Sequence, residues 1–555
     1  MPAILYERNA YDTSGPSLVG LQAANRQFLD ALVRDERLDE LGCYTAEQKD
    51  FETFCTMVNP AKPGKKTISR IPYGDHAGLS RAGVLHRYDP IITPHLWHRR
   101  SVDQRLYSVT GIIHSISSRP IMEAIGGLVV APFQPWDALI CTSRSGHKAV
   151  TTILSNWADY LAQRFNARPN LSIKLPIIPL GLDCEAFDAG TATADIRLKN
   201  RAQLGIGDED VAVLFVGRLS FKRKCHPVPM YLALQRAQNA TGARVHFIQA
   251  GQFEDEREEG AFRAAAAQFC PDVRCHVVGG KDVFRDRGVW FAGDIFLSLS
   301  DNIQETFGLA PVEAMAVGLP AVVADWDGYR DTVREGIDGF RIPTTLPSPS
   351  AGLDLSERYH ELGNYRHYYG TVAMSTAVDI DACAEALARL IRDPALRRRM
   401  GQSGRERART TYDWRTVLTA YHQLWDSLGE ARHSAKIVAP TLPGEPPYPL
   451  CDDPFRVFKG YASRTIAPET ILSLGDLSGS LQQLRRSWMT QFGAEWRVDG
   501  ETAAGILDRI GRHRTMTLAE LAEEVDTPED RLQRTIVYML KFGLLRTSNG
   551  PEASS

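Results

Sequence analysis

The 555-residue chain lacks the features that define several large classes of protein. Its nine cysteines are scattered and form no CxxC pair, which excludes a disulfide scaffold and disfavours a zinc site. No apolar run approaches the roughly 18–20 residues of a membrane-spanning helix. Glu7 and Asp12 interrupt the first residues, where a secretory signal is apolar throughout. We therefore expect a soluble, reduced, cytoplasmic protein, for which peripheral contact with a membrane stays open.

An excess of charge of one sign is also missing. The 64 Lys and Arg side chains are balanced by 67 Asp and Glu side chains, which leaves a net charge of −3. Proteins dedicated to nucleic acids usually carry a strongly basic face, so this balance disfavours DNA or RNA as a partner. Hydrophobic residues make up 43% of the chain, which is ordinary globular usage. At roughly 100–200 residues per domain, the length predicts three or four domains.

The chain contains no Walker P-loop, no metalloprotease helix and no GxGxxG turn. It does contain two long regions in which short β-rich runs alternate with amphipathic segments. The first region includes PAILYE, AANRQFLDALVRD, SVTGIIHSI, DALICTS and IKLPIIPLG. The second includes VAVLFVG, ARVHFIQAG, RCHVVGG, DIFLSLS and PAVVAD. This alternation predicts parallel sheets covered by helices on both faces, and so an α/β fold with two Rossmann-like, doubly wound domains.

The predicted domain boundaries follow changes in composition. We expect the first domain over residues 1–195 and the second over 196–410, because the stretch DAGTATADIRLKN separates the two sets of strands. Residues 431–470 include APTLPGEPPYPLCDDP, which indicates a semi-rigid linker. Residues 471–550 show three amphipathic helices and a short strand, the order of a winged helix. Acidic side chains slightly outnumber basic ones in this mostly helical domain, which favours self-association or a protein partner over DNA.

The segment DIFLSLSDNIQETFGLAPVEAMAVGLPAVVAD is the most informative part of the second domain. A strand ending near Ser300 is expected to lead into a polar loop and then a short helix, with Pro311 in its first turn and Gly318 at its end. The loop amides and the helix N-terminus suit an anion such as a phosphate. Glu305 in the loop and Glu313 in the helix are spaced to hydrogen-bond opposite ends of one elongated ligand, although either alone is equally consistent with a solvated acid.

The segment VAVLFVGRLSFKRKCHP places cations at the tip of a predicted buried strand. The strand ends at Gly217, and Arg218, Lys222, Arg223 and Lys224 follow at once. Four cations in this position are costly unless they are solvated or face an anion. Arg can bind a pyrophosphate through two hydrogen bonds, and Lys can supply a point charge. A solvated basic loop and a diphosphate site are both compatible with this segment taken alone.

Together the two segments resemble the donor domain of the retaining GT-B glycosyltransferases of the family 4 type. The resemblance is carried between residues 211 and 343 by GRLSFKRK, ETFGLAPVEAMAVGLPAVVAD and GYRDTVREGIDGFRIP. Weaker matches lie before residue 195. They include SLVGLQAANRQFLDAL, with Gly20 at the second of two usual glycines and Val19 replacing the first, and IIHSIS, which contains His114. TTYDWRTVLTAYHQLW resembles the helix, residues 411–430, that crosses back to the first domain.

The resemblance implies a set of residues that contact a nucleotide-sugar donor. They are Gly20, Arg218, Arg223, Lys224, Glu305, Thr306, Phe307, Gly308, Leu309 and Glu313. Within this set, Arg218 and a nearby lysine are expected to neutralise the diphosphate. The usual interval from the arginine falls on Arg223, and a one-residue bulge would bring Lys224 into that place, which we favour.

Other members of the set are implied to contact the sugar and the nucleoside. Glu313 is expected to hold the ribose hydroxyls, and Gly20 to let its loop approach the diphosphate closely. The loop residues 306–309 are expected to act through their backbone. His114 and Glu305 are the implied catalytic residues at the reacting centre.

The activity implied is that of a retaining hexosyltransferase, which moves a sugar from a nucleotide-diphosphate sugar to an acceptor hydroxyl without a metal or other cofactor. Breaking the bond between sugar and phosphate builds negative charge on the diphosphate, which fixed cations and helix N–H groups can stabilise. The acceptor, whether sugar, lipid-linked or protein, is not encoded in these motifs, nor is the donor base.

Two other interpretations stay open. The chain is also compatible with a regulatory or binding protein whose body is a degenerate sensor of nucleotide-sugars and whose tail is the active module. A different GT-B enzyme, such as a phosphorylase or a nucleotide-sugar epimerase, is the second. The segment TTLPSPSAGLDLSERYHELGNYRHYYG, around residues 344–370, departs from the family pattern, and we interpret it as a surface loop or a contact with an acceptor or partner.

Overall fold

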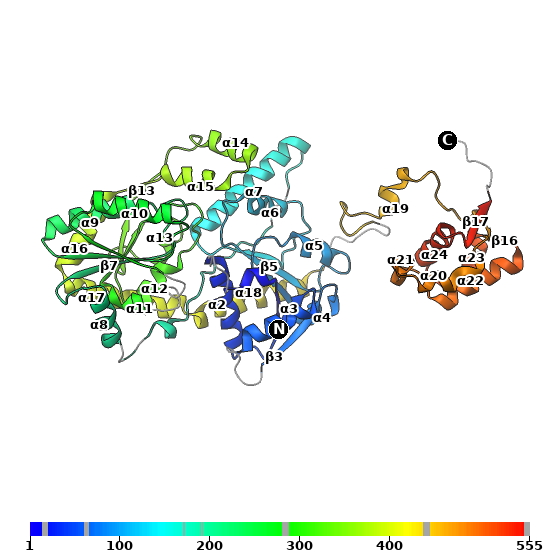
Figure 1. The fold of residues 1–555 in the computed structure, drawn as a ribbon, viewed down its shortest axis with the longest axis horizontal. Coiled ribbons are helices and arrows are strands. Elements are labelled where there is room, and N and C mark those ends of the chain that lie inside the picture. The colour runs from blue at the N-terminus through cyan, green and yellow to red at the C-terminus, as the bar shows by residue number, and fades with distance from the viewer. Residues whose placement is uncertain are drawn as a thin grey trace. The chain divides into compact units, whose positions relative to one another are not determined.

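The computed structural model describes residues 1–13, 20–59, 66–169, 172–188, 190, 193–279, 288–436 and 445–548 of the chain. The chain forms two compact units, Met1–Tyr448 and Pro449–Ser555 (Figure 1). Two six-stranded parallel sheets lie in the first unit, and a three-stranded antiparallel sheet lies in the second. Within the described ranges, no helix is both long and apolar enough to cross a bilayer.

The first sheet has the doubly wound strand order, β3-β2-β1-β4-β5-β6, with every neighbouring pair parallel. Its strands are β1 (Pro2–Leu5), β2 (Glu40–Thr45), β3 (Thr67–Pro72), β4 (Val84–Arg87), β5 (Ser108–Ile112) and β6 (Ala138–Ile140). The order reverses between β1 and β4, where Ala3 lies opposite Leu85. In a sheet of this kind, ligands bind beyond the carboxyl ends of the strands at that reversal.

Helices cover both faces of the first sheet (Figure 1). They are α1 (Arg8–Tyr11), α2 (Gly20–Arg34), α3 (Gln48–Val58), α4 (His76–Ala82), α5 (Thr93–Arg100), α6 (Arg119–Gly127) and α7 (Arg144–Phe165). In α2, Ala24, Phe28 and Leu32 recur every four residues and are buried, which gives the helix one apolar face toward the core.

The second sheet repeats this topology. Its order is β12-β11-β10-β7-β8-β9, and it reverses between β7 and β10. Its strands are β7 (Val211–Val216), β8 (Val245–Ala250), β9 (Arg274–Val278), β10 (Ile295–Ser298), β11 (Ala321–Ala324) and β12 (Gly339–Ile342). Val213 faces one hydrophobic core and its neighbour Leu214 faces the other, so both sides of the sheet are covered.

The helices around the second sheet supply those two cores. They are α8 (Thr193–Gln203), α9 (Pro227–Thr241), α10 (Glu256–Phe269), α11 (Gly288–Ala292), α12 (Leu309–Val317), α13 (Tyr329–Thr332), α16 (Ile380–Arg392) and α17 (Pro394–Arg407). Cys383, Leu387 and Leu390 of α16 are buried at helical spacing in one core, whereas Val312 and Met315 of α12 are buried in the other. The predicted fold class is therefore confirmed for the two Rossmann-like domains.

One predicted strand is wrong. The segment IKLPIIPLG, residues 173–181, forms only single bridges to β6, at Lys174 and Ile177. Pro176 and Pro179 lack the N–H groups that a continuous ladder would need, and the carbonyls of Lys174 and Pro176 accept from the strand instead. Strands β2, β3 and β4 complete the sheet in place of that segment and were not among the predicted runs.

A long helix after the second sheet packs against the first domain. The helix α18 (Trp414–Ser434) buries Tyr421, whose ring lies 4.9 Å from that of Phe28 in α2. Near its end, the Arg432 guanidinium donates to the carbonyls of Gly83 and Leu106. The chain thus returns to its first domain along α18, and the resemblance to a crossover helix had pointed to this segment.

The stretch around residues 344–370 is a helical hairpin rather than the surface loop we considered. It is formed by α14 (Leu353–Leu362) and α15 (Tyr365–Met374), and the short strands β13 (Thr344–Thr345) and β14 (Ala377–Val378) pair at its base. Gly363 adopts φ of 64° between the helices, and the Asn364 side chain caps α15. The hairpin lies beside α6 of the first domain (Figure 1), where the Tyr359 hydroxyl accepts from the Arg119 amide at 2.9 Å.

In the second unit, a sheet of order β16-β15-β17 packs on three helices. The elements are β15 (Ile471–Leu474), α22 (Gly500–His513), β16 (Thr515–Thr517), α23 (Leu518–Glu524), α24 (Glu529–Lys541) and β17 (Leu545–Ser548). The short helix α19 (Pro454–Val457) precedes β15, and the short helices α20 (Leu481–Arg486) and α21 (Trp488–Gln491) lie between β15 and α22. The predicted three helices and final strand are present. Because β17 pairs with β15, which precedes the helices, the winged-helix assignment itself stays a prediction.

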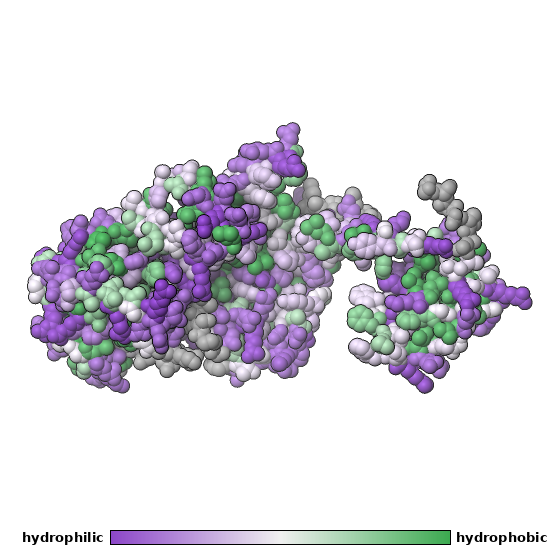
Figure 2. All heavy atoms as spheres, turned by 45° about the horizontal axis from the view of Figure 1, so that its top comes forward, coloured by the Kyte–Doolittle hydropathy of each residue, from purple (hydrophilic) through white to green (hydrophobic). Residues whose placement is uncertain are grey.

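The second unit also exposes large apolar side chains on its surface (Figure 2). Trp488 and Phe492, in and just after α21, are 86% and 88% exposed. The buried core of the same unit comes from other elements and includes Leu472, Ile506 and Ile536. The exposed aromatics therefore contribute little to the stability of this unit.

Candidate functional site

The two sequence segments singled out above lie together at the reversal of the second sheet. Arg218 follows β7, and the loop that contains Glu305 follows β10, the strand that pairs with β7 at the reversal. Parallel strands end at one edge, so residues far apart in the chain meet there. This edge is where a doubly wound sheet binds its ligand.

A tight turn after β7 brings Lys224 back to this edge. The Lys224 amide donates to the Ser220 carbonyl at 3.0 Å, which closes a turn over residues 220–224. The Lys224 ammonium forms an ion pair with the Glu305 carboxylate. Burial alone would lower the pKa of Lys224, but Glu305 outweighs it and raises that pKa above its usual value. The turn brings Lys224 to Glu305, and its equivalence to the one-residue bulge stays a prediction.

Arg218 and Arg223 differ in what their guanidinium groups contact. Arg223 donates to the Tyr369 hydroxyl at 3.0 Å and pairs with Glu254 at 2.6 Å. Among the described residues, none makes a hydrogen bond or an ion pair with the Arg218 guanidinium, whose pKa is lowered by burial and by Arg223. A partly buried cation without a local partner is the arrangement that an incoming anion completes.

The loop before α12 is fixed by close packing. Gly308 adopts φ of 81°, and a Cβ placed on it would lie 2.0 Å from the Tyr329 ring. The Phe307 side chain is buried against Tyr412, so only its backbone can face a ligand. Gly308 caps α12 without a side-chain hydrogen bond among the described residues, and the first amides of the helix, from Leu309 on, are left for an anion.

The predicted ends of α12 are confirmed: the helix starts at Leu309, includes Pro311 and stops at Gly318, which adopts φ of 90°. Glu313 lies on this helix and is partly buried. Its distance along the helix from Glu305 is consistent with contact to a different part of a ligand.

His114 and Gly20 are the two predicted site residues in the first domain, and they lie in different elements. The His114 carbonyl accepts a hydrogen bond from the Thr306 hydroxyl, so His114 lies against the loop that contains Glu305. Burial lowers the pKa of His114 to about 4, and its Nε2 is buried without a partner among the described residues. Gly20 begins α2 and has open space around its Cβ position, whereas Val19 lies outside the described residues.

Two acidic residues at the same edge were missed by the sequence interpretation. Asp301 is buried, its carboxylate accepts from the His226 amide at 3.1 Å, and burial raises its pKa to about 7. Asp327 follows β11 with φ of 44°, and burial together with Glu305 raises its pKa well above the ordinary value. Their position directly after buried strands was the available signal, since strand ends of one parallel sheet converge.

Asp327 also marks the contact between the two domains. Its backbone carbonyl accepts from the Ser145 hydroxyl at 3.2 Å, and Asp331 binds the Arg144 amide at 2.7 Å. The carboxyl edges of the two sheets therefore meet through their loops, with His114 and the Glu305 loop at the same boundary.

The edge of the first sheet carries a second polar cluster that the motifs did not reveal. Arg87, at the end of β4, pairs with Asp89 at 2.6 Å and with Glu7, which follows β1, at 3.3 Å. The Tyr88 hydroxyl donates to the other oxygen of Glu7. Burial alone would lower the pKa of Arg87, but Asp89 raises it. Only long-range strand pairing brings these residues together.

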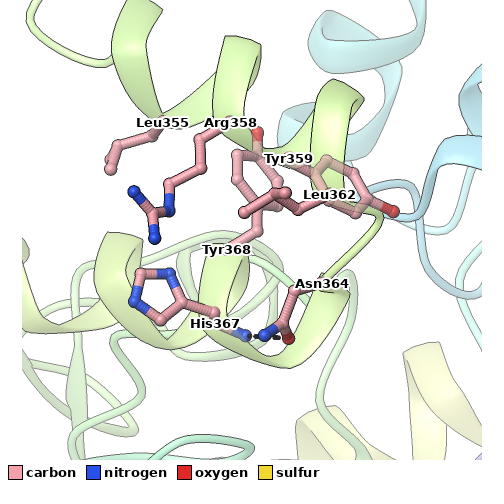
Figure 3. Close-up of a pocket in the computed structure, with 7 residues that line it drawn as sticks. All are labelled: Leu355, Arg358, Tyr359, Leu362, Asn364, His367 and Tyr368. Carbon is pink, nitrogen blue, oxygen red and sulfur yellow. Dashed lines mark hydrogen bonds between the residues drawn. The ribbon is translucent and has the colours of Figure 1, made fainter.

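A pocket lies between the helices α14 and α15 of the hairpin (Figure 3). Its lining residues are Leu355, Arg358, Tyr359, Leu362, Asn364, His367 and Tyr368. In Figure 3 the Arg358 and His367 side chains approach each other across it, and both are exposed at the surface. This pocket contains none of the residues predicted from the motifs.

Comparisons with known proteins find similarity in the second domain. Residues 196–376 match the family described as Glycosyl transferases group 1. The chain is 27% identical over 245 residues to a D-inositol 3-phosphate glycosyltransferase of Geodermatophilus obscurus, covering 41% of this chain and 50% of that protein. It is 25% identical over 243 residues to the sulfoquinovosyl transferase SQD2 of Arabidopsis thaliana, and the match covers 43% of this chain and 37% of that protein. The chain thus spans about half the length or less of these two curated relatives.

A solved structure, that of Anabaena Alr3699/HepE in complex with UDP and glucose, covers 77% of this chain and is itself covered completely. Its sequence identity is 15% and its TM-score 0.48, so the fold described here rests on the two strand orders rather than on that likeness. The predicted resemblance to glycosyltransferases is confirmed by the family match over residues 196–376.

Proposed function

We propose that this chain is a glycosyltransferase that takes a sugar from a nucleoside-diphosphate donor and transfers it to an acceptor hydroxyl. The observation that carries the proposal is the Arg218 guanidinium at the reversal of the second sheet, which has no hydrogen bond or ion pair with a described residue and lies at the same edge as the Lys224–Glu305 pair. Relatives named as glycosyltransferases, and a family match over the same domain, support it.

In the proposed complex, Arg218 binds the diphosphate and Lys224 adds a second positive charge. The first amides of α12, which no side chain of the described residues caps, contribute partial positive charge to the same anion. Arg223 is less suited to this role because its guanidinium is turned toward Glu254 and Tyr369, whereas the Lys224 ammonium lies at Glu305 in the loop after β10. Lys224 is therefore our choice between the two cations that the sequence left open.

Glu305 and Glu313 are assigned to the hydroxyl groups of the donor. Glu305 sits at the sheet edge, and when the donor binds, its partner Lys224 is shared between the carboxylate and the phosphates. Glu313, deeper along α12, is assigned to the ribose. Gly20 at the start of α2 leaves room for the diphosphate on the side of the first domain.

The chemical step follows the movement of charge. The acceptor oxygen bonds to the anomeric carbon as the bond from that carbon to the phosphate oxygen breaks, and the acceptor proton leaves with the diphosphate. Arg218, Lys224 and the α12 amides stabilise the negative charge that develops, a role worth about 10²–10³-fold in rate for one well-placed donor. His114, neutral above about pH 5 because burial lowers its pKa to about 4, is assigned to contact the sugar.

We further propose retention of the anomeric configuration and metal-independent transfer, since the cations of the chain itself face the departing group. A retaining hexosyltransferase delivers the acceptor to the face from which the diphosphate leaves. Nuclear magnetic resonance of the anomeric proton in the first product formed distinguishes retention from inversion.

A thermal-shift screen against UDP-, GDP- and ADP-sugars tests the proposal. A ligand present at about 100 times its Kd should stabilise the native protein by about 2.7 kcal/mol. We expect one nucleotide class to do so in wild type and the response to fall in Arg218→Ala and Glu313→Ala. A chain that responds to none of these donors and releases no nucleoside diphosphate contradicts the proposal.

A further inference from the structure

The α14–α15 hairpin connects the two domains through the hydroxyl of one tyrosine. The Tyr365 hydroxyl lies 2.7 Å from the Ser117 hydroxyl, in the loop that follows β5 of the first domain. It also accepts a hydrogen bond from the Gln304 amide at 3.1 Å, in the loop that follows β10 of the second. Gln304 is adjacent to Glu305, so the hairpin reaches the centre of the proposed donor site.

The rings around Tyr365 hold this hydroxyl in place. The centroid of the Tyr369 ring lies 4.9 Å from that of Tyr365, in an edge-on arrangement, and that of Tyr359 lies 5.9 Å away. The same two neighbours contact the domains themselves. Tyr359 accepts from the Arg119 amide at 2.9 Å, and Tyr369 accepts from Arg223 at 3.0 Å. A hydroxyl packed between fixed aromatic rings loses little conformational entropy when it forms its hydrogen bonds.

The loop that contains Glu305 is thereby held on both sides of that residue. On one side, Gln304 is bound by Tyr365. On the other, the Thr306 hydroxyl donates to the His114 carbonyl in the first domain. Ser117 is itself buried, with 4% of its surface exposed, so the loss of the Tyr365 hydroxyl would leave a buried hydroxyl without this partner.

We infer that Tyr365 is a positioning residue for glycosyl transfer. By tying Ser117 and Gln304 together, it keeps the Glu305 loop against the first domain in the arrangement that the transfer step uses. It contacts neither reactant in this role. The inference rests on the proposed function for its catalytic consequence, but the geometric part, restraint of residues 302–308, stands independently of it.

The test compares two conservative variants in the same hairpin. Tyr365→Phe removes only the bridging hydroxyl. Tyr368→Phe is the matched control, because Tyr368 stacks on Tyr359 at 4.6 Å, bonds Ser356, and makes its polar contact inside the hairpin. Loss of one or two neutral hydrogen bonds that act in the transition state predicts a fall in kcat of about tenfold for Tyr365→Phe, with the donor KM changed less than about twofold. For Tyr368→Phe we expect kcat within about twofold of wild type.

A second variant separates positioning from a general loss of stability. Ser117→Ala removes the other end of the bridge, so Tyr365→Phe combined with Ser117→Ala should lower kcat by clearly less than the product of the two single effects. Effects that multiply fully, or equal kcat values for Tyr365→Phe and Tyr368→Phe, would overturn the inference.

Hydrogen exchange of the loop supplies a measurement that does not depend on activity. Amides of residues 302–308 should exchange faster in Tyr365→Phe than in wild type, and at the wild-type rate in Tyr368→Phe. Unchanged exchange in Tyr365→Phe overturns the inference. If the wild-type chain binds no nucleotide-sugar, the proposed function fails instead, and faster exchange in Tyr365→Phe still supports the restraint of the loop.

Discussion

The two Rossmann-like sheets share one strand order but use the charges at their reversals differently. At the edge of the first sheet, Arg87 is occupied by Asp89 and Glu7, so its cation is neutralised within the cluster. At the edge of the second, Lys224 pairs with Glu305, and the Arg218 guanidinium has no hydrogen bond or ion pair with a described residue. The same topology therefore places a paired arginine, Arg87, at one edge, and at the other an arginine, Arg218, without a hydrogen bond or ion pair among the described residues.

This difference means that the two edges suit different kinds of ligand. An edge with an uncommitted cation and free helix amides suits an anion, whereas an edge whose arginine is consumed by carboxylates suits neutral, hydroxyl-rich groups. The topology decides only where a ligand binds, and the side chains after each strand decide its chemistry.

Breaking the ion pair at the second edge should have the largest effect. Lys224→Met leaves the partly buried Glu305 carboxylate without its partner, and we expect the free energy of unfolding to fall by about 3 kcal/mol. Urea denaturation measures this fall. The double variant Lys224→Met with Glu305→Gln should recover most of the stability without recovering donor turnover. A single variant as stable as wild type would show that the pair is not a structural feature of this edge.

Substitution of Gly308 should cause the second-largest loss of stability, because backbone strain and a steric clash add. Its φ of 81° disfavours a side chain, and a Cβ would lie 2.0 Å from the Tyr329 ring. Gly308→Ala should cost about 2–3 kcal/mol of stability and displace the loop beside Glu305. Gly205→Ala is the control, since Gly205 has φ of 63° but open space around it, and should cost about 1 kcal/mol. Equal losses in the two variants would remove the packing argument.

At the first edge, Arg87→Met should destabilise the protein and leave donor binding intact. Asp89 and Glu7 lose their cation, so we expect a loss of about 2 kcal/mol in urea denaturation. The Kd for a nucleoside diphosphate should change by less than about twofold, because the proposed diphosphate site lies on the other sheet. A large loss of nucleotide affinity in this variant would break the distinction between the two edges.

The smallest effect we predict is a pH dependence of opposite sign in the two domains. Burial lowers the pKa of His86 in the first domain to about 3, so its stabilising contribution is present above pH 6.5 and is lost as the pH falls. Burial raises the pKa of Asp301 in the second to about 7, so its contribution is present at low pH and is lost as the pH rises through 7.

Urea titrations at several pH values measure this contrast. Between pH 5 and 8, wild type should lose about 1–2 kcal/mol relative to Asp301→Asn. Between pH 7.5 and 4.5, wild type should lose a similar amount relative to His86→Gln, again about 1–2 kcal/mol. Parallel pH profiles for wild type and either variant would contradict the assignment for that group.

Local sequence patterns were enough to predict the elements around the second edge, but they did not predict the polar cluster at the first edge. The buried run VAVLFVG, the cations after it, and Pro311 and Gly318 around α12 predicted strand, turn and helix because each signal lies within a few residues. The Glu7–Arg87–Asp89 cluster joins residues about 80 positions apart, and only the pairing of β1 with β4 creates it. The same holds for Tyr365, whose contacts at Ser117 and Gln304 depend on the packing of the hairpin between domains.

The prolines explain where a local pattern misled. In IKLPIIPLG the hydrophobic run indicated a strand, but two missing N–H groups reduced it to single bridges. The spacing of residues in the sequence was also not enough to choose between Arg223 and Lys224 as the second phosphate-binding cation. It depends on a turn closed by the Lys224 amide and on the partners that Glu254 and Tyr369 give to Arg223.

We propose above all that Arg218, which has no hydrogen bond or ion pair with a described residue, binds the diphosphate of a donor. Isothermal titration of the stabilising nucleoside diphosphate into wild type, Arg218→Ala and Arg223→Ala tests it most directly, because each variant removes one arginine charge and the two positions are five residues apart. Removal of a partly buried charge that contacts an anion predicts a Kd at least about tenfold weaker for Arg218→Ala, against less than about threefold for Arg223→Ala. Equal weakening in both variants, or none in Arg218→Ala, would contradict the account.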